Sequence, residues 1–392
     1  MKILFVSPVP TDPPNAGNRA RVFHLVQALR DFGHSVTFAY IPYEPADLDA
    51  MRSRFGKHLY ILRTNGPPAF HDTVAKLKRK LGRLLHLEAS YRWGVDEWFD
   101  PGLTHQVTEL NQRYNFDIAM IEYVFLSPLT AALRHSVRTI IDIHDLMGDR
   151  HKMLLAAGVE PNWFATTRQE EISALNRAHA TIAIQEEEAA YLREHTSTEV
   201  FCVGPIGHYS REPLGDPANF RLLFVGSANP INMHALERFV ASTLVGIRVR
   251  VPQVELAIAG RAGIRDSWPN GVVALGEVPS LEVAYAQAAV VVNPVTAGTG
   301  FNIKTIEALG YGKPLVTTQA GVRGLGAGFE QALHVADDEQ SFVNSVVSLL
   351  RSKSERTALA QRAFTAAQTW RRRQLDNLRR ALLIAPISGD SA

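Results

Sequence analysis

The chain has 392 residues, which is enough for two domains of ordinary size with a core in each. Apolar residues make up 46% and charged residues 20%, a composition that excludes a disordered protein. The formal net charge is +2, without a basic tail or stripe, so we expect no nucleic-acid partner.

Two features bear on where the protein works. Cys202 is the sole cysteine, which excludes disulfides and cysteine zinc sites within one chain and indicates a reducing compartment. The start, MKILFVSPVP, has too short an apolar run for a signal-peptide core, and no run of eighteen apolar residues occurs. We therefore expect a cytoplasmic protein.

Short apolar runs, rich in β-branched residues, predict strands in the first half of the chain. They are KILFVS (2–7), SVTFAYI (35–41), HLYILR (58–63), DIAMIEY (117–123), RTIIDI (138–143), TIAIQ (181–185) and EVFCV (199–203). Between the first two runs, Val22, Leu25, Val26 and Leu29 follow the spacing of a helix, and Gly33 predicts its end.

Residues 71–93 predict a basic amphipathic helix with aromatic residues nearby. One stripe is apolar (Val74, Leu77, Leu81, Leu84, Leu85), and lysines and arginines crowd the other side. Such a helix, close to Tyr91 and Trp93, can lie on an anionic membrane surface, which makes this segment a candidate peripheral membrane contact. The alternative is a solvated helix that packs on its own domain.

A stretch rich in glycine and proline, GPIGHYSREPLGDPAN (204–219), predicts a linker, which we assign to residues 205–220. The strand pattern then restarts with RLLFVG (221–226), VELAIAG (254–260), GVVALG (271–276), AVVVNP (289–294), PLVTT (314–318) and ALHVA (332–336). Alternating strands and helices predict an α/β protein with two doubly wound, Rossmann-like domains facing a cleft. We assign them to residues 1–204 and 221–368, with a last helix and tail over 369–392.

The loop after AVVVNP carries the strongest chemical signal. Its sequence, TAGTGFNIKTIEALGYGKPLVTTQAGVRGL (296–325), places glycines before a helix that begins near Asn302. Lys304 in the first turn opposes the helix dipole unless an anion lies between them, and Glu307 lies on the same face one turn later. A phosphate and sugar hydroxyls in one pocket would use both residues. The alternative is an ordinary surface ion pair between Lys304 and Glu307.

This stretch resembles the donor-binding segment of the GT-B glycosyltransferases, in particular the family 4-like enzymes (glycosyl transferases group 1). The resemblance runs along the whole chain, through the first βαβ unit (1–37), DIHDLMGD (142–149), RLLFVGSANPINMHALERF (221–239) and residues 272–294. It implies a retaining transfer of a sugar from a nucleotide-diphosphate sugar to a glycan or lipid-linked acceptor, in polysaccharide or glycoconjugate assembly. It also implies no cofactor besides the donor and no bound metal.

The resemblance assigns roles to residues. Glu307 takes the place of the glutamate on the donor ribose, Lys304 that of the lysine on the diphosphate, and His144 that of the histidine on the transferred sugar. The other implied donor-site residues are Gly17, Asn18, Arg19, Ser227, Asn232, Arg261, Val278, Thr299, Gly300, Phe301, Asn302 and Ile303.

Three positions depart from the family pattern. Thr299 stands where a glutamate often precedes Glu307, and Ser227 and Asn232 stand where an arginine and a lysine are usual. Arg261, and Arg19 or Arg21, are candidates to supply the missing positive charge. Because of these losses, a non-catalytic nucleotide-sugar-binding or scaffold protein stays open as an alternative, and so does a sugar-nucleotide epimerase.

Metal-ligand patterns are weak in this sequence. We identify no cluster of His, Asp or Glu with ligand spacing at a predicted strand edge. Asp47–Leu48–Asp49 resembles a metal-binding D-x-D motif, but it is better explained as the capped start of a helix. The first loop also lacks the glycine pattern of a dinucleotide dehydrogenase.

Overall fold

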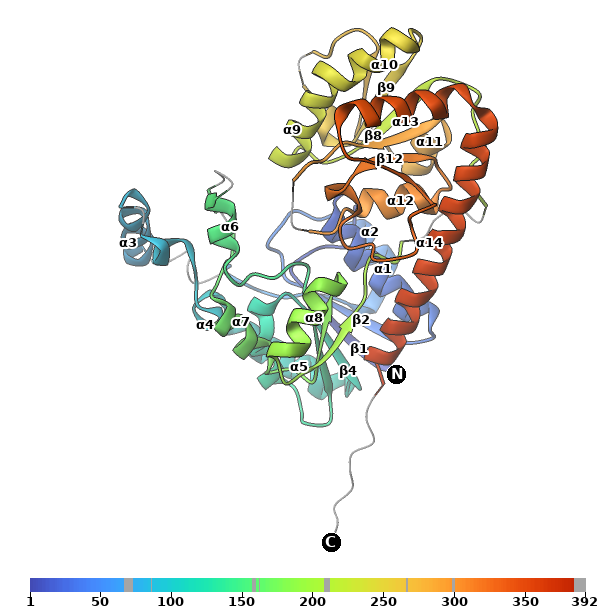
Figure 1. Ribbon diagram of the computed structural model, residues 1–392. Helices are drawn as coiled ribbons and strands as arrows, with labels where there is room; N and C mark the ends of the chain where they lie inside the picture. The colour runs from blue at the N-terminus through green and yellow to red at the C-terminus, as the bar shows by residue number, and fades with distance from the viewer. Residues whose placement is uncertain are drawn as a thin grey trace. The chain divides into compact units, whose positions relative to one another are not determined.

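The computed structural model describes residues 1–66, 73–85, 87–156, 160–161, 163–207, 212–265, 267–297 and 300–383, and Thr299 lies outside them. The chain divides into two compact units, Met1–Gly204 with Gln374–Ala392, and Pro205–Arg373 (Figure 1). Each unit has its own parallel sheet, which confirms the prediction of two doubly wound domains. Across the described residues, no helix combines the length and apolar character needed to cross a membrane.

The sheet of the first unit has seven parallel strands, and each predicted run overlaps one of them. They are β1 (Lys2–Ser7), β2 (Ser35–Tyr40), β3 (Leu59–Ile61), β4 (Ile118–Glu122), β5 (Arg138–Asp142), β6 (Ala180–Ala183) and β7 (Glu199–Cys202). Their order in the sheet is β3-β2-β1-β4-β5-β6-β7. The chain therefore reverses direction across the sheet between β1 and β4, and such a switch point is where open α/β sheets bind ligands.

Helices connect these strands. They are α1 (Gly17–Asp31), α2 (Leu48–Phe55), α3 (Thr73–Leu84), α4 (Val95–Trp98), α5 (Gly102–Tyr114), α6 (Arg150–Ala156), α7 (Arg168–Leu175) and α8 (Glu186–His195). Gly33, with a φ of +84°, follows the end of α1 as predicted. The Asp47 carboxylate caps α2 by accepting a hydrogen bond from the Ala50 N–H at 2.9 Å, which confirms the cap interpretation of Asp47–Leu48–Asp49.

The second sheet repeats the same topology. Its strands are β8 (Arg221–Val225), β9 (Glu255–Ala259), β10 (Val272–Gly276), β11 (Val290–Asn293), β12 (Leu315–Thr318) and β13 (His334–Ala336), in the order β10-β9-β8-β11-β12-β13. The switch point lies between β8 and β11. The connecting helices are α9 (Pro230–Arg238), α10 (Leu244–Arg250), α11 (Leu281–Ala286), α12 (Ile303–Gly310) and α13 (Glu339–Arg351).

Burial on both faces explains why the strands read as unbroken apolar runs. In β8, Leu222 and Phe224 belong to the core cluster that packs against α9, α10 and α13, while Leu223 belongs to the cluster under α11 and α12. Successive side chains of a strand point to opposite faces, so both alternating sets must be apolar here.

Helix α14 (Lys353–Ala381, red in Figure 1) belongs to the second unit through Arg373 and to the first from Gln374. In the second unit, the Trp370 indole N–H donates to the Pro205 carbonyl at 2.9 Å. In the first, the Asn377 amide donates to the Cys202 carbonyl at 2.8 Å. Asp216, in the segment 205–220, pairs with Arg356 of α14 at 2.7 Å.

Candidate active site

Two carboxylates lie side by side at the carboxyl edge of the first sheet. Glu122 and Asp142 end the neighbouring strands β4 and β5, face each other in register, and are fully buried. Arg21 of α1 holds both oxygens of Asp142, with Nε at 2.8 Å from Oδ2, and also donates to the Val203 carbonyl at 2.8 Å. Its guanidinium provides the positive charge that the buried Asp142 carboxylate requires.

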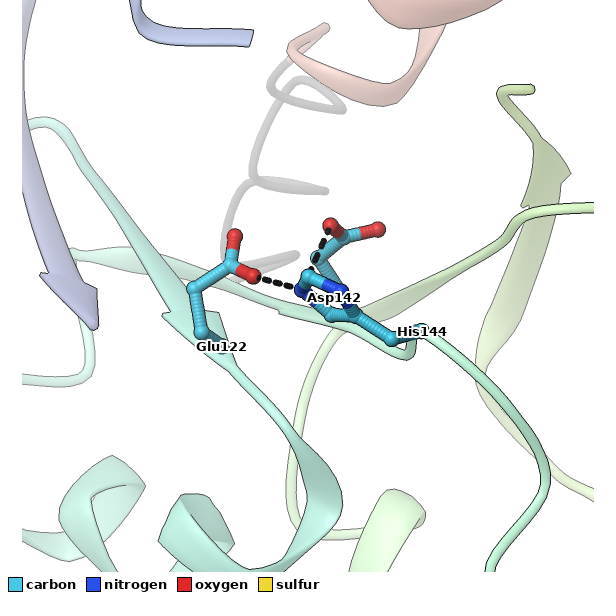
Figure 2. Close-up of side chains that lie close together, drawn as sticks. All are labelled: Glu122, Asp142 and His144. Atoms are coloured by element: carbon cyan, nitrogen blue, oxygen red, sulfur yellow. Dashed lines mark hydrogen bonds and ion pairs between the residues drawn. The ribbon is translucent and has the colours of Figure 1, made fainter. Parts of the chain in front are cut away.

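His144 lies over this pair, two residues beyond β5. Its Nε2 is hydrogen-bonded to Glu122 Oε2 and is 4.0 Å from Asp142 Oδ2, so both carboxylates face the same ring nitrogen (Figure 2). The imidazole stacks on the Tyr123 ring, with 4.3 Å between the centroids. The tertiary structure thus places the predicted His144 at the switch point of the first sheet.

Burial sets the protonation state of this pair. It raises the pKa of Glu122 to about 8 and lowers the pKa of His144 to about 4, because each charged form loses its hydration. Burial thus favours the neutral form of each group. A neutral pair shares one hydrogen between Glu122 Oε2 and His144 Nε2. When the carboxyl donates this hydrogen, the ring carries its own proton on Nδ1 and His144 can donate from there.

The structure corrects one expectation about metal ligands. The sequence showed no suitable cluster at a strand edge, but Glu122, Asp142 and His144 each offer one ligand-type atom, all within 4.8 Å of one another. Pairing of β4 with β5 brings them together, and no local spacing reveals that pairing. Arg21 already occupies both oxygens of Asp142, so a divalent ion would have to displace a guanidinium to bind here.

A polar cavity of about 290 Å³ opens beside His144 at the same switch point. Aromatic, acidic and basic side chains all contribute to its lining. The lining residues are Pro8, Val9, Asn18, Tyr43, Glu44, Tyr123, Asp145, Met147, Arg150 and Trp163. Gly17, the first residue of α1, is exposed next to it. Arg19 is ion-paired with Glu44 at 2.7 Å, and Arg21 is ion-paired with Asp142.

The predicted donor residues of the second unit gather at the other switch point. The Lys304 ammonium, from the first turn of α12, donates to Asn232 Oδ1 at 2.5 Å and lies 4.6 Å from the centre of the Phe224 ring. Asn232, in the first turn of α9, donates in turn to the Ser227 carbonyl at 3.0 Å. Lys304 therefore contacts Asn232, the residue that stands where the family pattern usually has a lysine.

Glu307 has a separate partner. The hydroxyl of Tyr285, a buried residue of α11, donates to Glu307 Oε2 at 3.0 Å, and the Tyr285 ring stacks on Tyr311. Lys304 and Glu307 thus interact with Asn232 and Tyr285 respectively, which contradicts the alternative of an ordinary surface ion pair. Tyr285 was missed from the sequence because it belongs to another helix.

Burial also shifts the protonation of these two groups. The pKa of Lys304 falls to about 7 because of desolvation, which the carboxylate of Glu307 only partly offsets. The pKa of Glu307 rises to about 7 for the same reason, against the effect of the Tyr285 hydroxyl and Lys304. Perturbed groups of opposite type, close together at a sheet edge, are typical of a functional site.

The remaining predicted residues surround this point. Asn302 donates to the Ala320 carbonyl at 2.9 Å. The ring centroids of Phe301 and Trp370 are 5.6 Å apart. Ile303 is the first residue of α12 and follows the loop that contains Gly300. Val278 packs on the same core cluster as Phe301. Arg261 is exposed at the start of the turn after β9. Thr299 lies outside the described residues, so its assignment stays a prediction.

A glycine permits the close approach of two loops at this edge. Gly260 follows β9 with a φ of +94°, and a Cβ at this position would lie 2.4 Å from the Gly226 carbonyl oxygen. Only glycine accommodates both constraints. The loops after β8 and β9 therefore meet beside Ser227 and Arg261.

Comparison with known proteins supports one interpretation of this arrangement. Residues 16–201 match the family described as glycosyl transferase 4-like domain, and residues 219–352 match glycosyl transferases group 1. An uncharacterized 44.6 kDa protein in the cps region of Klebsiella pneumoniae is 22% identical, over 94% of this chain and 95% of that protein.

Solved structures share the architecture over nearly the full length. HepE of Anabaena in complex with UDP-glucose has a TM-score of 0.63 and 15% identity, covering 97% of this chain and 99% of that one. Sucrose-phosphate synthase of Thermosynechococcus elongatus has a TM-score of 0.62 and 17% identity, covering 94% of each chain. At this identity the likeness shows the fold, which is that of the GT-B glycosyltransferases.

Proposed function

Because the chain belongs to the group 1 glycosyltransferases, with a glycosyl transferase 4-like domain in its first half, we propose that it moves a sugar from a nucleotide-diphosphate sugar to an acceptor hydroxyl with retention of anomeric configuration. The observation that carries the proposal is the constellation of Lys304, Asn232, Glu307 and Tyr285 at the switch point of the second sheet. It offers one ammonium and one carboxylate, each held by a neutral partner.

The donor diphosphate would lie between Lys304 and the first turn of α12. Negative charge develops on the phosphate as the bond between the sugar and the diphosphate breaks. A preorganised ammonium and a helix N-terminus stabilise that charge without reorganisation of solvent. Asn232 accepts from the ammonium and keeps it in place, while Glu307 accepts hydrogen bonds from the ribose hydroxyls.

The first unit would supply the sugar and acceptor contacts. The His144 Nδ1–H donates to a substituent of the transferred sugar, and the cavity beside it receives the acceptor. The acceptor oxygen forms the new bond to the anomeric carbon on the face that the diphosphate leaves. The departing phosphate oxygen takes the acceptor proton, so no protein base and no metal ion is required.

The acceptor is proposed to be a glycan or a lipid-linked sugar, in polysaccharide or glycoconjugate assembly. The position of the Klebsiella relative in a cps region supports this class of pathway. The protein would then meet its acceptor at a membrane surface through the segment 71–93.

A panel of nucleotide sugars tests the proposal. A donor present at a hundred times its dissociation constant adds about 2.7 kcal/mol to the free energy of unfolding, which a thermal-shift assay detects. UDP-glucose is the first candidate, because HepE was crystallised with it. We expect one donor to stabilise the chain and to be hydrolysed slowly without acceptor. Binding without any hydrolysis or transfer would favour the non-catalytic alternative, and a changed sugar in the recovered donor would favour an epimerase.

A further inference from the structure

Helix α3 turns its leucines away from the protein. Leu77, Leu81 and Leu84 are 69%, 57% and 70% exposed, although they lie on the apolar stripe of the helix. Two further leucines just after the helix, Leu85 and Leu87, are exposed as well. Three large apolar side chains in solvent on one face of α3, with two more exposed just after it, mark an interaction surface rather than a random exposure. The helix packs on its own unit, against the turn at residues 88–91, but these leucines do not take part in that packing.

The arginines of α3 hold the helix in this orientation. The Arg79 guanidinium lies 3.2 Å from the centre of the Trp93 ring and pairs with Glu97 at 3.0 Å. Arg83 lies over Tyr91 and is within 3.5 Å of Glu160. Cation–π and ionic contacts thus fix the inner face of α3, and leave the apolar face for something outside the chain.

The leucine surface is joined to the cavity beside His144 by α6. Arg150, at the start of α6, lines the cavity, and the next two residues, His151 and Lys152, bind Glu88 in the turn on which α3 packs. Trp163 lines the cavity too and is 40% exposed. Helices α3 and α6 lie on the same side of the first unit (Figure 1), where Met153 and Leu155 of α6 are also exposed.

Charge indicates what covers this surface. Helix α3, with the sequence TVAKLKRKLGRL, has no acidic residue, and Lys78 and Lys80 are exposed beside the leucines. An anionic bilayer complements both features, since apolar side chains enter the acyl region and lysines contact the head groups. A second copy of the chain would place the same lysines opposite each other in a two-fold interface, which their repulsion disfavours.

We infer that the acceptor is a lipid-linked sugar, bound with its sugar in the cavity beside His144 and its lipid in the bilayer that α3 enters. This inference rests on the proposed function, because it names the acceptor class. Tyr43 and Trp163 line the cavity with aromatic rings on which a pyranose can pack, and the carboxylates of Glu44 and Asp145 accept from its hydroxyls. The lipid leaves past Trp163 toward the exposed side of α6.

Vesicle flotation of the full chain tests the membrane surface. We expect the wild type to float with phosphatidylcholine vesicles that contain a third phosphatidylglycerol, and binding to fall at least about tenfold when Leu77, Leu81 and Leu84 are all changed to Ser. Val249→Ser is the matched control, because Val249 is 79% exposed on α10 of the second unit. Equal flotation of the triple variant and the wild type, or no flotation of either, would overturn the inference. So would a dimer that the triple variant loses.

Alkyl glycosides test the link to the cavity. We expect octyl pyranosides, below their micelle concentration, to bind at least about tenfold more tightly than the methyl pyranosides, and to shift the fluorescence of Trp163. The Trp163→Phe variant, measured in parallel, isolates the signal of this residue from the other tryptophans. Equal affinity of the two glycosides, or an unchanged Trp163 signal, would overturn the inference.

The two proposals fail in different ways. If no nucleotide sugar stabilises the wild-type chain, the proposed function is wrong. If a nucleotide sugar binds but flotation does not depend on the leucines, or the octyl chain adds no affinity, only the lipid-linked acceptor is wrong.

Discussion

Single side chains at the two switch points carry most of the proposed chemistry, and Lys304 is the clearest case. Its low pKa means that the protein holds it in an environment unfavourable to its charge until an anion arrives. Groups kept in this state serve ligand binding rather than stability.

Replacement of Lys304 by Ala should therefore lower turnover far more than it lowers stability. Loss of one preorganised charge contact costs roughly 3 kcal/mol of transition-state stabilisation, about a hundredfold in rate. We expect the melting temperature to change little. Steady-state kinetics and thermal unfolding measure the two effects, with Lys353→Ala, an exposed lysine of the same unit, as the control. Transfer by Lys304→Ala at the wild-type rate would remove Lys304 from the phosphate site.

Donor affinity should be highest near pH 7. The donor requires Lys304 charged and Glu307 ionised, and in the free protein both have a pKa of about 7. Binding takes up a proton at Lys304 above this pH and releases one from Glu307 below it, so affinity falls on both sides, by about tenfold per pH unit at the limits. Titration calorimetry across pH measures this profile. Lys304→Met should remove the alkaline fall and Glu307→Gln the acidic fall, and a flat wild-type profile would contradict the assignment.

Glu122 should act as a positioning residue for His144. If its neutral carboxyl donates to Nε2, the amide of Glu122→Gln can replace that donor, and activity should stay within a few fold of wild type. Glu122→Met removes the donor and should lower kcat by about tenfold or more with little change in KM. The ¹⁵N shifts of His144 would report the tautomer: Nδ1–H in the wild type and the Gln variant. An equal loss in both variants would indicate a merely structural role.

At the scale of elements, the start of α12 depends on the turn at residues 320–322. Asn302 donates to the Ala320 carbonyl at 2.9 Å, and Thr305 of α12 donates to the Gly321 carbonyl at 2.7 Å. Gly321 is buried against β12, where a Cβ would lie 1.9 Å from Thr317 Oγ1. The glycine therefore allows the turn to pack between the sheet and the helix that carries Lys304.

Gly321→Ala should displace this turn. We expect the free energy of unfolding to fall by about 1–3 kcal/mol because of overpacking, and donor affinity to fall with it. Gly215→Ala is the control, since no atom lies within 4 Å of its added Cβ, and should change stability by less than about 0.5 kcal/mol. Chemical denaturation measures both. Equal stability of the two variants would show that the turn accommodates the added methyl group without loss of stability.

At the scale of the whole molecule, each unit places a cation of its own at its switch point: Arg21 in the first and Lys304 in the second. Arg21 pairs with the buried Asp142 carboxylate, and the proposed phosphate site faces Lys304 and a helix N-terminus. A divalent ion would duplicate charge that the chain already provides.

Transfer activity should therefore survive chelation. We expect the rate in excess EDTA to equal that in magnesium or manganese, measured by release of the nucleotide diphosphate. A strict metal requirement would contradict the mechanism and point to Glu122, Asp142 and His144. It would not point to Asp47 and Asp49, because Asp47 caps α2 and Asp49 pairs with Arg52 at 2.8 Å.

The sequence by itself determined the strands of both sheets and the part of the candidate site that lies on α12. Strands buried on both faces leave continuous apolar runs, so every predicted run proved to be a strand of a parallel sheet. Local signals were equally direct: Gly33 follows the end of α1, Asp47 caps α2, and the positions of Lys304 and Glu307 on one helix place them together at a sheet edge.

Only the tertiary structure decided which distant side chains meet and which helix faces turn outward. Glu122 and His144 are 22 positions apart and Lys304 and Asn232 are 72 apart, and strand pairing joins them across distances that no local pattern encodes. The periodicity of α3 identified its leucine stripe but not its direction. That direction depends on Trp93 and Glu97, which bind Arg79 and so present the leucines to the outside. A periodic pattern shows which residues share a face, whereas the energy of the contacts on both sides decides where that face points.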